Sequence, residues 1–565
     1  MFLYLNVVAR YMRPRTVLLI VLVGVLAVGS ASLSAGAASH GHAAEQVPVQ
    51  SSADTEPPDP PGDPLGWENG YWYNESIDVT PDDGLNESEL DAVVARSMAR
   101  VESVRGIEFN GTVPVEVISR AAFSDNRSVS DTNTSTANRI HQNVKWEAMF
   151  SIGEDENALS SFRSTQTATI GGYYSPGDDR IVIVSENATT PKMDEVTLSQ
   201  ELFHALQDQK LEISFNRSTR EGLNAANGII EGDGNLVDQI YQTNCGDDWN
   251  CVTPSSDDSS GGGDTSDINY GIYLTQYQPY NDGPAFVQQI RSEGGWEAVN
   301  DVYDNPPTST EQVIHPEKYP DEGPVNITFT DSSSDEWSVP DLGNGSVDYA
   351  RFGQAGLSAM FLRPAVASQY SDVPVLRPEQ IFTDRRTLNY GLDVTNGWGN
   401  DRLYPYATNE SAETNETGYV WQIEWDTVDD AGAFADAYVE LLEYYGAESV
   451  PENESTYRVS DDEPFGDAFY VGHDGQTVTI VNGPTVADLS EIRAGVAPAN
   501  ETDPDETTES DETNTDTDET TESDETAGPD GATTDTGDGF GPGFSVAVAL
   551  LAVLASAAVA VRRHT

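Results

Sequence analysis

The net charge of the chain is the feature that most limits how it can fold. The 565 residues include 95 Asp and Glu but only 28 Lys and Arg, which gives a formal net charge of −67. Repulsion among so many carboxylates opposes a compact state, but molar salt shortens the Debye length to about 3 Å and screens it. Because 37% of the residues are hydrophobic, with 24 Tyr, 17 Phe and 9 Trp, we expect folded domains. The composition favours a halophilic protein and argues against nucleic-acid binding, which needs a basic face.

The N-terminal segment, residues 1–38, is predicted to be a secretory signal peptide. Basic residues up to Arg15 precede the apolar run 17–28, and the small residues at 35–37 offer a cleavage site. A retained membrane anchor is the alternative interpretation of the same run. Residues 39–66 are rich in Pro, Ser and Asp, and we expect them to form a disordered linker to the body.

The C-terminal segment indicates attachment to the cell surface. Residues 496–540 are rich in Thr, Asp and Glu and are expected to form an extended stalk, because they cannot build a core. Residues 541–565 follow, with Pro542-Gly543-Phe544, an apolar run long enough for a marginal transmembrane helix, and two arginines that fit the positive-inside rule.

The tripeptide Pro542-Gly543-Phe544 before an apolar helix resembles the PGF-CTERM sorting signal of haloarchaeal surface proteins. The resemblance implies that an archaeosortase is a partner of the chain, which cleaves the tail and replaces it with a lipid. A permanent helix anchor is the alternative. Both interpretations place the body on the extracellular side of the cell membrane.

Two further features agree with export. Cys245 and Cys251 are the only cysteines, and in an oxidising exterior they are expected to close a small disulfide loop rather than to bind a metal. Asn-x-Ser/Thr sequons recur along the body, for example at Asn110, Asn187 and Asn326, and indicate a glycoprotein.

Apolar periodicity and turn residues predict an α+β body. Helical patterns and strand-like patterns alternate along it, and Pro-Gly at a turn marks one β-hairpin. The expected elements are a helix at 90–103, a hairpin at 171–184, a helix capped by Asp194 and running to about Gln209, a helix at 223–241, helices that begin at Gly283 and Gly294, strands at 419–423, 468–471 and 477–481, and a helix at 431–445.

Residues 198–209 contain most of a metalloprotease signature. The pattern H-E-x-x-H on a helix places two zinc-binding histidines one turn apart, with a general-base Glu beside the first. Glu201 and His204 occupy the Glu and second His positions, whereas Gln200 occupies the first His position. The spacing puts Gln200 and His204 on one helix face. Glu231, on the next predicted helix, is placed to supply a third ligand.

Several motifs in a fixed order resemble those of secreted gluzincin-like proteins, metallopeptidases whose zinc ligands are His, His and Glu. The matching segments are GYY at 172–174, QELFHALQDQ at 200–209, EGD at 231–233, GPAF at 283–286, PTSTEQVIHPEKY at 307–319 and GWGNDRL at 397–403. The resemblance implies a zincin-like domain at 67–376, with an edge hairpin and an active-site helix, and a smaller α+β domain at 377–495. It assigns Glu201 to the general base and His204 and Glu231 to zinc ligands.

The residue at position 200 argues against an ordinary zinc site. Glutamine offers only a neutral carbonyl oxygen, whereas zinc sites are built from His, Cys, Asp and Glu. Zinc binding is therefore expected to be weak or lost, unless another residue replaces the missing imidazole. His141 and His315 are the candidates for that role.

These features lead to the expectation of a surface-anchored haloarchaeal protein with a degenerate metallopeptidase-like domain. It would act as a non-catalytic or weakly active envelope or binding module, with a peptide or an envelope glycoprotein as its ligand. Two alternatives stay open: an active secreted zinc metallopeptidase with an altered ligand set, and a purely structural envelope glycoprotein.

Overall fold

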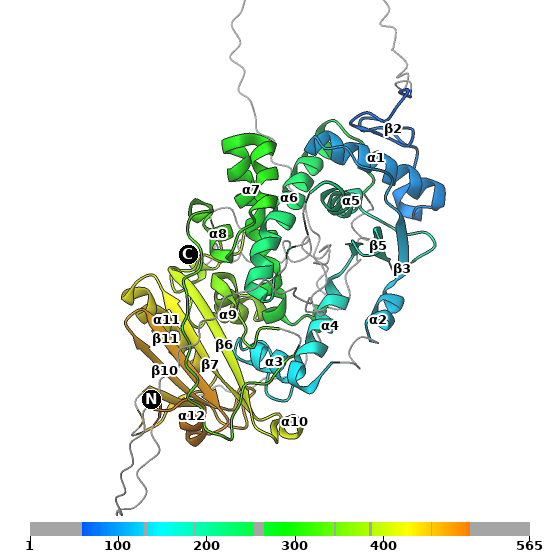
Figure 1. Ribbon diagram of the computed structural model, residues 1–565. Coiled ribbons are helices and arrows are strands. Elements are labelled where there is room, and N and C mark those ends of the chain that lie inside the picture. The colour runs from blue at the N-terminus through cyan, green and yellow to red at the C-terminus, as the bar shows by residue number, and fades with distance from the viewer. Residues whose placement is uncertain are drawn as a thin grey trace, which may run out of the picture. The chain divides into compact units, whose positions relative to one another are not determined.

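The computed structural model describes residues 59–497, except 129–133, 186, 212, 214, 216, 254–264, 344–345, 384–386, 452 and 454. The predicted signal peptide, most of the predicted linker, nearly all of the stalk and the sorting motif Pro542-Gly543-Phe544 lie outside the described residues. Helices and several antiparallel or mixed sheets alternate along the described chain, so the predicted α+β class is confirmed (Figure 1).

The first part of the chain is mainly helical. Its elements are β1 (Trp67–Glu68), β2 (Tyr71–Trp72), α1 (Glu87–Arg105), β3 (Val115–Ser119), α2 (Arg120–Ser128), α3 (Thr136–Glu147), α4 (Ala158–Thr169), β4 (Gly172–Ser175), β5 (Arg180–Ser185), α5 (Glu195–Lys210), α6 (Arg220–Asp247), α7 (Tyr270–Asp304) and α8 (Thr310–Ile314). The predicted hairpin is β4 and β5, and the predicted helices over 90–103, 194–209 and 223–241 lie within α1, α5 and α6.

The second part contains the largest sheet. Its elements are α9 (Gly353–Ala367), β6 (Trp398–Ala407), α10 (Ser411–Thr414), β7 (Thr417–Trp425), α11 (Val428–Tyr444), β8 (Glu448–Ser449), β9 (Thr456–Arg458), β10 (Ala468–Asp474), β11 (Thr477–Gly483) and α12 (Val486–Ile492). The strand order is β6-β7-β11-β10-β9-β8, with every neighbouring pair antiparallel. The strands and the helix predicted between 419 and 481 are all present.

A small mixed sheet precedes α5 in the chain and packs against it. Its order is β3-β5-β4, in which β3 runs parallel to β5 and β4 runs antiparallel. Asp194 begins α5 as predicted, because its carboxylate accepts a hydrogen bond from the Val196 N–H at 3.0 Å. Apolar residues of α5 such as Leu202 and Leu206 are fully buried, which fixes the helix against the sheet and leaves its other face for the site.

The prediction for the next two helices, which were expected to begin at Gly283 and Gly294, was half right. The first helix of α7 begins earlier, at Tyr270, so Gly283 lies inside it. The helix is interrupted at Gly295, where φ is 70° and ψ is −164°, and a second helix follows there, close to the predicted start. Gly283 does not mark the start of a helix; it is the residue at which α7 contacts α6. A Cβ at Gly232 of α6 would lie 2.5 Å from the Gly283 carbonyl, so the two helices meet backbone to backbone.

Three arginines of α1 are buried and paired with carboxylates of the two following long helices. Arg96 and Arg100 pair with Glu195 at the start of α5, at 2.7 and 2.5 Å. Arg105 pairs with Asp233 in α6 at 3.0 Å. All five side chains are at most 1% exposed. These buried ion pairs tie α5 and α6 to a common helix.

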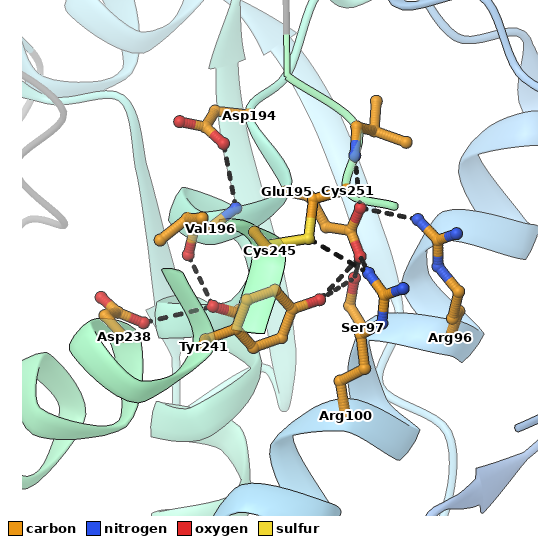
Figure 2. Close-up of a disulfide and its surroundings, with 12 residues drawn as sticks. Arg96, Ser97, Arg100, Asp194, Glu195, Val196, Asp238, Tyr241, Cys245 and Cys251 are labelled. Carbon is orange, nitrogen blue, oxygen red and sulfur yellow. Dashed lines mark hydrogen bonds and ion pairs between the residues drawn. A yellow bond between two sulfur atoms is a disulfide. The ribbon is translucent and has the colours of Figure 1, made fainter. Parts of the chain in front are cut away.

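Glu195 is the most heavily bonded of these carboxylates (Figure 2). Besides the two arginines, it accepts hydrogen bonds from the Tyr241 hydroxyl at 2.7 Å and from the Val252 N–H at 2.6 Å. Val252 follows the disulfide between Cys245 and Cys251, which joins the end of α6 to the chain beyond it. The predicted disulfide loop therefore helps to close the shell of donors around Glu195.

A second buried carboxylate organises the six-stranded sheet. Asp401 in β6 accepts hydrogen bonds from the N–H groups of Phe352 and Gly353 at the start of α9, at 3.0 and 2.9 Å. It also accepts from the indoles of Trp398 at 3.1 Å and Trp421 at 3.2 Å. Four N–H donors compensate the cost of burying this charge. The motif at 397–403 thus fixes α9 onto the sheet.

Residues before position 377, which were assigned to the first predicted domain, pack into the hydrophobic core of the second predicted domain. α9 shares a hydrophobic core with β6, β7 and α11, and residues 338 and 350 form isolated bridges to β6. The predicted domain boundary at 377 stays a prediction. Within the described ranges, no helix is both long and apolar enough to cross a membrane, and the predicted C-terminal span lies outside those ranges.

Replacing Glu195 with Gln is expected to lower the free energy of unfolding by about 3–5 kcal/mol, because Arg96 and Arg100 then stay buried without a counter-charge. Urea unfolding in molar salt measures the loss. The matched control is Glu297→Gln, which removes an exposed carboxylate of α7. A loss no larger than that of the control would contradict the proposed importance of the ion pairs.

Candidate functional site

The residues predicted from the H-E-x-x-H pattern lie on α5, where they are almost fully buried. Gln200, Glu201 and His204 are 8%, 0% and 9% exposed, and Glu231 on α6 is 3% exposed. The structure brings His204 and Glu231 together, with His204 Nε2 at 3.4 Å from Glu231 Oε2. That distance is long for a hydrogen bond but lies within the 4 Å limit of an ion pair.

The proton positions of His204 follow from its other contact. Its Nδ1 lies 2.7 Å from Gln207 Oε1. Gln207 Nε2 already donates to the Ile230 carbonyl at 3.0 Å and to the Tyr303 hydroxyl at 2.6 Å. Gln207 Oε1 is therefore the acceptor, and His204 Nδ1 carries a proton. A lone pair on Nε2 would face a carboxylate, so this nitrogen is better protonated too.

The charges around His204 support an imidazolium. Burial by itself lowers the pKa of His204, but the nearby carboxylates of Glu231 and Glu201 outweigh it and raise the pKa to about 10. On the other side of Glu231, the Tyr280 hydroxyl of α7 hydrogen-bonds to the carboxylate. His204 and Glu231 thus form a buried ion pair held by neighbours on α5, α6 and α7.

A chain of hydrogen bonds connects this ion pair to α1. The Tyr303 hydroxyl, which accepts from Gln207, donates to Asp233 at 2.9 Å. Asp233 in turn pairs with Arg105. The sequence analysis did not predict these hydrogen bonds around the ion pair. Gln207 and Asp233 lie inside the recognised motifs and could have been singled out, whereas Tyr303 and Arg105 carry no sequence signal.

Glu201 has a different environment from Glu231. Its side chain is fully buried, and its contact with the backbone N–H of Tyr174 in β4 does not reach the geometry of a full hydrogen bond. Burial raises the pKa of Glu201 to about 7, with Glu231 adding to the shift and His204 and the Tyr174 N–H opposing it. A carboxyl group that titrates near neutrality can exchange a proton with a bound group.

Strand β4 passes beside Glu201 and has a free edge. In the described sheet β4 pairs only with β5. Val184 donates to the Gly171 carbonyl at 2.9 Å, and because antiparallel pairs alternate, the backbone groups of Gly172 and Tyr174 point away from β5. A Cβ at Gly172 would lie 3.6 Å from Glu201 Cγ. An extended peptide could therefore add to this edge next to Glu201.

The donor set at this place does not fit zinc. Catalytic zinc sites use three protein ligands, and His204 and Glu231 supply two. No third His, Cys, Asp or Glu of the described chain joins them within 4.8 Å. The amide nitrogen of Gln200 is buried without a hydrogen-bond partner, so this side chain is not held in place as a carbonyl ligand.

The two histidines that were candidates to replace the missing zinc ligand lie in other parts of the protein. His141 lies on α3, where neither ring nitrogen has a hydrogen-bond partner, and burial lowers its pKa to about 4. His315 follows α8 and lies 3.2 Å from Gln354 Nε2 on α9. Neither belongs to a group of potential ligands that includes His204.

A different group of acidic side chains could hold a metal ion. The carboxylates of Glu311, Glu322 and Asp426 converge, with ligand atoms within 4.8 Å of one another. Lys318 Nζ lies among them, at 2.7, 2.5 and 3.5 Å. The Lys318 ammonium already balances the charges of these three carboxylates. The four side chains therefore connect the 307–319 motif to the loop before α11.

Comparison with known proteins extends this picture only for the second part of the chain. Residues 340–493 match the model of a domain of unknown function (DUF8575). The match covers α9, the six-stranded sheet and its helices, and leaves α5 and α6 outside. No curated protein and no solved structure matches the chain.

The ion pair predicts a pH-dependent contribution to stability. The folded-state pKa of His204, about 10, exceeds the usual value of 6.5, so the pair stabilises fully below pH 6.5 and loses its effect as the pH rises through 10. The stability difference between the wild type and Glu231→Gln should therefore shrink between pH 6.5 and 10. Urea unfolding across this range measures it, with the exposed Glu440→Gln as control. A difference that does not change with pH would exclude the ion pair.

Proposed function

We propose that the chain is a cell-surface protein whose metallopeptidase-like site has lost its catalytic metal and serves as a non-catalytic or weakly active binding module. The observation that carries the proposal is the contact between His204 Nε2 and Glu231 at 3.4 Å. The nitrogen that would bind zinc is paired with the carboxylate that would bind the same ion. With Gln200 in the third position, zinc affinity is weak or lost.

The proposed ligand is an extended peptide or a strand of an envelope glycoprotein. The free edge of β4 offers main-chain donors and acceptors of the kind used in strand addition. Glu201 lies beside that edge, and apart from a weak contact with the Tyr174 N–H its carboxyl oxygens have no hydrogen-bond partner. A peptide N–H or a basic side chain of the ligand would supply such a partner.

The proposed location is the outer side of the membrane of a halophilic archaeon. The net charge of −67, the disulfide between Cys245 and Cys251, and the PGF sequence at 542–544 support it. The anchor is a lipid added by an archaeosortase or, alternatively, a retained helix.

An active peptidase is the second candidate, and the state of Glu201 favours it. A buried carboxyl group whose pKa is about 7 suits a general base. For this function a ligand set other than His, His and Glu would have to hold the metal, and zinc content distinguishes the two candidates.

Zinc content of the full chain, purified in molar salt, tests the proposal. We expect little zinc in the wild type and close to one equivalent in Gln200→His, because an imidazole completes the ligand set of His204 and Glu231. Gln200→Asn, which keeps an amide, is the matched control and should stay without zinc. One equivalent of zinc in the wild type, with peptide cleavage abolished by Glu201→Gln, would replace the proposal with the active peptidase.

Cell-surface sorting has a separate test. Replacing Pro542, Gly543 and Phe544 with Ala should leave the tail uncleaved, so that the protein from whole cells has a larger mass than the wild type and carries no lipid. Ala substitutions at 537–539 are the control and should leave processing unchanged. Equal masses for all three proteins, with the tail present, would favour the permanent helix anchor.

A further inference from the structure

The Asn-x-Ser/Thr sequons of the body differ in how the folded chain uses their side chains. In the sequons that begin at Asn74, Asn86 and Asn326, both the asparagine and the hydroxyl residue two positions later are exposed. In those that begin at Asn409 and Asn415, the hydroxyl residue is buried. A transferase that adds a glycan to asparagine recognises both residues of the sequon. The folded protein therefore offers it the first group and withholds the second.

The sequon at Asn326 is the most open of the first group. It lies between α8 and α9, and its backbone is anchored just before the asparagine. The Val325 N–H donates to the Gly399 carbonyl at 3.0 Å, and the Val325 carbonyl accepts from Asn400 Nδ2 at 2.6 Å. Within the described chain, the side chains of Asn326 and Thr328 have no hydrogen-bond partner. A glycan on this amide would displace no contact of the fold.

Asn86 shows that a sequon can be structural and still be free to react. Its Oδ1 caps α1 by accepting from the N–H groups of Ser88 and Glu89, at 3.1 and 3.2 Å, and from the Ser88 hydroxyl at 2.8 Å. The cap uses only the oxygen, and Nδ2 has no partner in the described residues. At Asn74, just after β2, neither the asparagine nor Ser76 makes a side-chain hydrogen bond to the described chain.

Asn415 is committed to the fold. Its Nδ2 donates to the Glu154 carbonyl at 2.6 Å, and its Oδ1 accepts from Asn143 Nδ2 at 3.2 Å. Thr417, the hydroxyl residue of this sequon, begins β7 and is 5% exposed. A sugar on Asn415 would have to fit where α3 and the segment after it meet the sheet. The amide contacts that join these elements would be lost.

The sequon at Asn409 is blocked at its other end. Asn409 itself is exposed, but Ser411 is fully buried. The Ser411 hydroxyl accepts from the Thr408 N–H at 2.8 Å and donates to the Glu416 carbonyl at 2.5 Å. Two further sequons lie between the groups, because their exposed amides already donate once, Asn110 to the Gln209 carbonyl and Asn187 to the Thr190 hydroxyl.

We infer that Asn74, Asn86 and Asn326 carry N-linked glycans in the exported, folded protein, and that Asn409 and Asn415 do not. The inference rests on the proposed location outside the membrane, because sequons are modified in exported chains. In the reaction, Asn Nδ2 bonds to the anomeric carbon of a glycosyl phosphate donor. The anomeric C–O bond breaks, phosphate leaves with the electron pair, and Nδ2 loses one proton to a base of the transferase. The amide oxygen is not consumed, so the Asn86 cap survives.

Glycopeptide mass spectrometry of the full chain, produced in a haloarchaeal host, tests the inference. We expect a glycan on most copies at Asn74, Asn86 and Asn326, and none at Asn409 or Asn415. A glycan on most copies at Asn415 would show that sugar is attached before the chain folds, and would overturn the inference. Bare asparagine at all three exposed positions would overturn it too.

Variants at one sequon show which atom carries the sugar. Asn326→Gln and Thr328→Ala should each lose one glycan from the intact mass, whereas Thr328→Ser keeps the hydroxyl and should retain it. Both positions are exposed and without partners in the described chain, so these variants should fold. A glycan retained in Asn326→Gln would place the sugar on another residue and contradict the assignment. The matched control is Asn409→Gln, whose glycan mass should equal that of the wild type.

Protease treatment of intact cells separates this inference from the proposed location. If protease releases the body from intact cells and the three asparagines are bare, the location stands and the inference fails. If protease reaches the body only after lysis and no glycan is present, both fail. Release from intact cells together with glycans at Asn74, Asn86 and Asn326 would support both.

Discussion

The buried arginines of α1 are the constraint on which the helical part depends. Arg96 and Arg100 bind Glu195 at the start of α5, and Arg105 binds Asp233 in α6. In a chain with a net charge of −67, these interior cations compensate carboxylates that no solvent reaches. Because both helices are tied to α1 and also pack on each other, these ion pairs help to hold the helices that carry His204 and Glu231.

The same network holds the site in place without a metal ion. Gln207, Tyr303 and Asp233 connect His204 to α1 by hydrogen bonds that need no ion. The charge of Glu231, in turn, is balanced by His204. Removing a metal from an ordinary site leaves its buried ligands unpaired, whereas here His204 and Glu231 pair with each other and only Gln200 and Glu201 keep polar atoms without a hydrogen-bond partner. Such a site can keep its geometry without a bound metal ion, which suits the proposed binding module.

Sequence reasoning was successful where local patterns decide the structure. The hairpin before α5, the Asp194 cap and the disulfide loop all follow from turn residues, capping and short spacing. It failed where tertiary contact overrides a local signal. Gly283 and Pro284 indicate a helix start, but Gly283 lies inside the helix that begins at Tyr270, where it packs closely on Gly232.

The candidate site was predictable only in part. The motif named Gln200, Glu201, His204 and Glu231, because their residue types carry chemistry at a fixed spacing. It could not give the partner of each atom. The roles of Tyr303 and Arg105 depend on helices that are distant in sequence.

The backbone contact between α6 and α7 has a consequence for how such chains change over time. At Gly232 any side chain would collide with main-chain atoms of Gly283, so the helices would have to separate. At Gln200 the buried amide nitrogen has no hydrogen-bond partner to lose. Substitution is therefore expected to cost less at position 200 than at Gly232. Packing requirements alone can preserve the glycines of a sequence motif while a polar residue of the same motif changes.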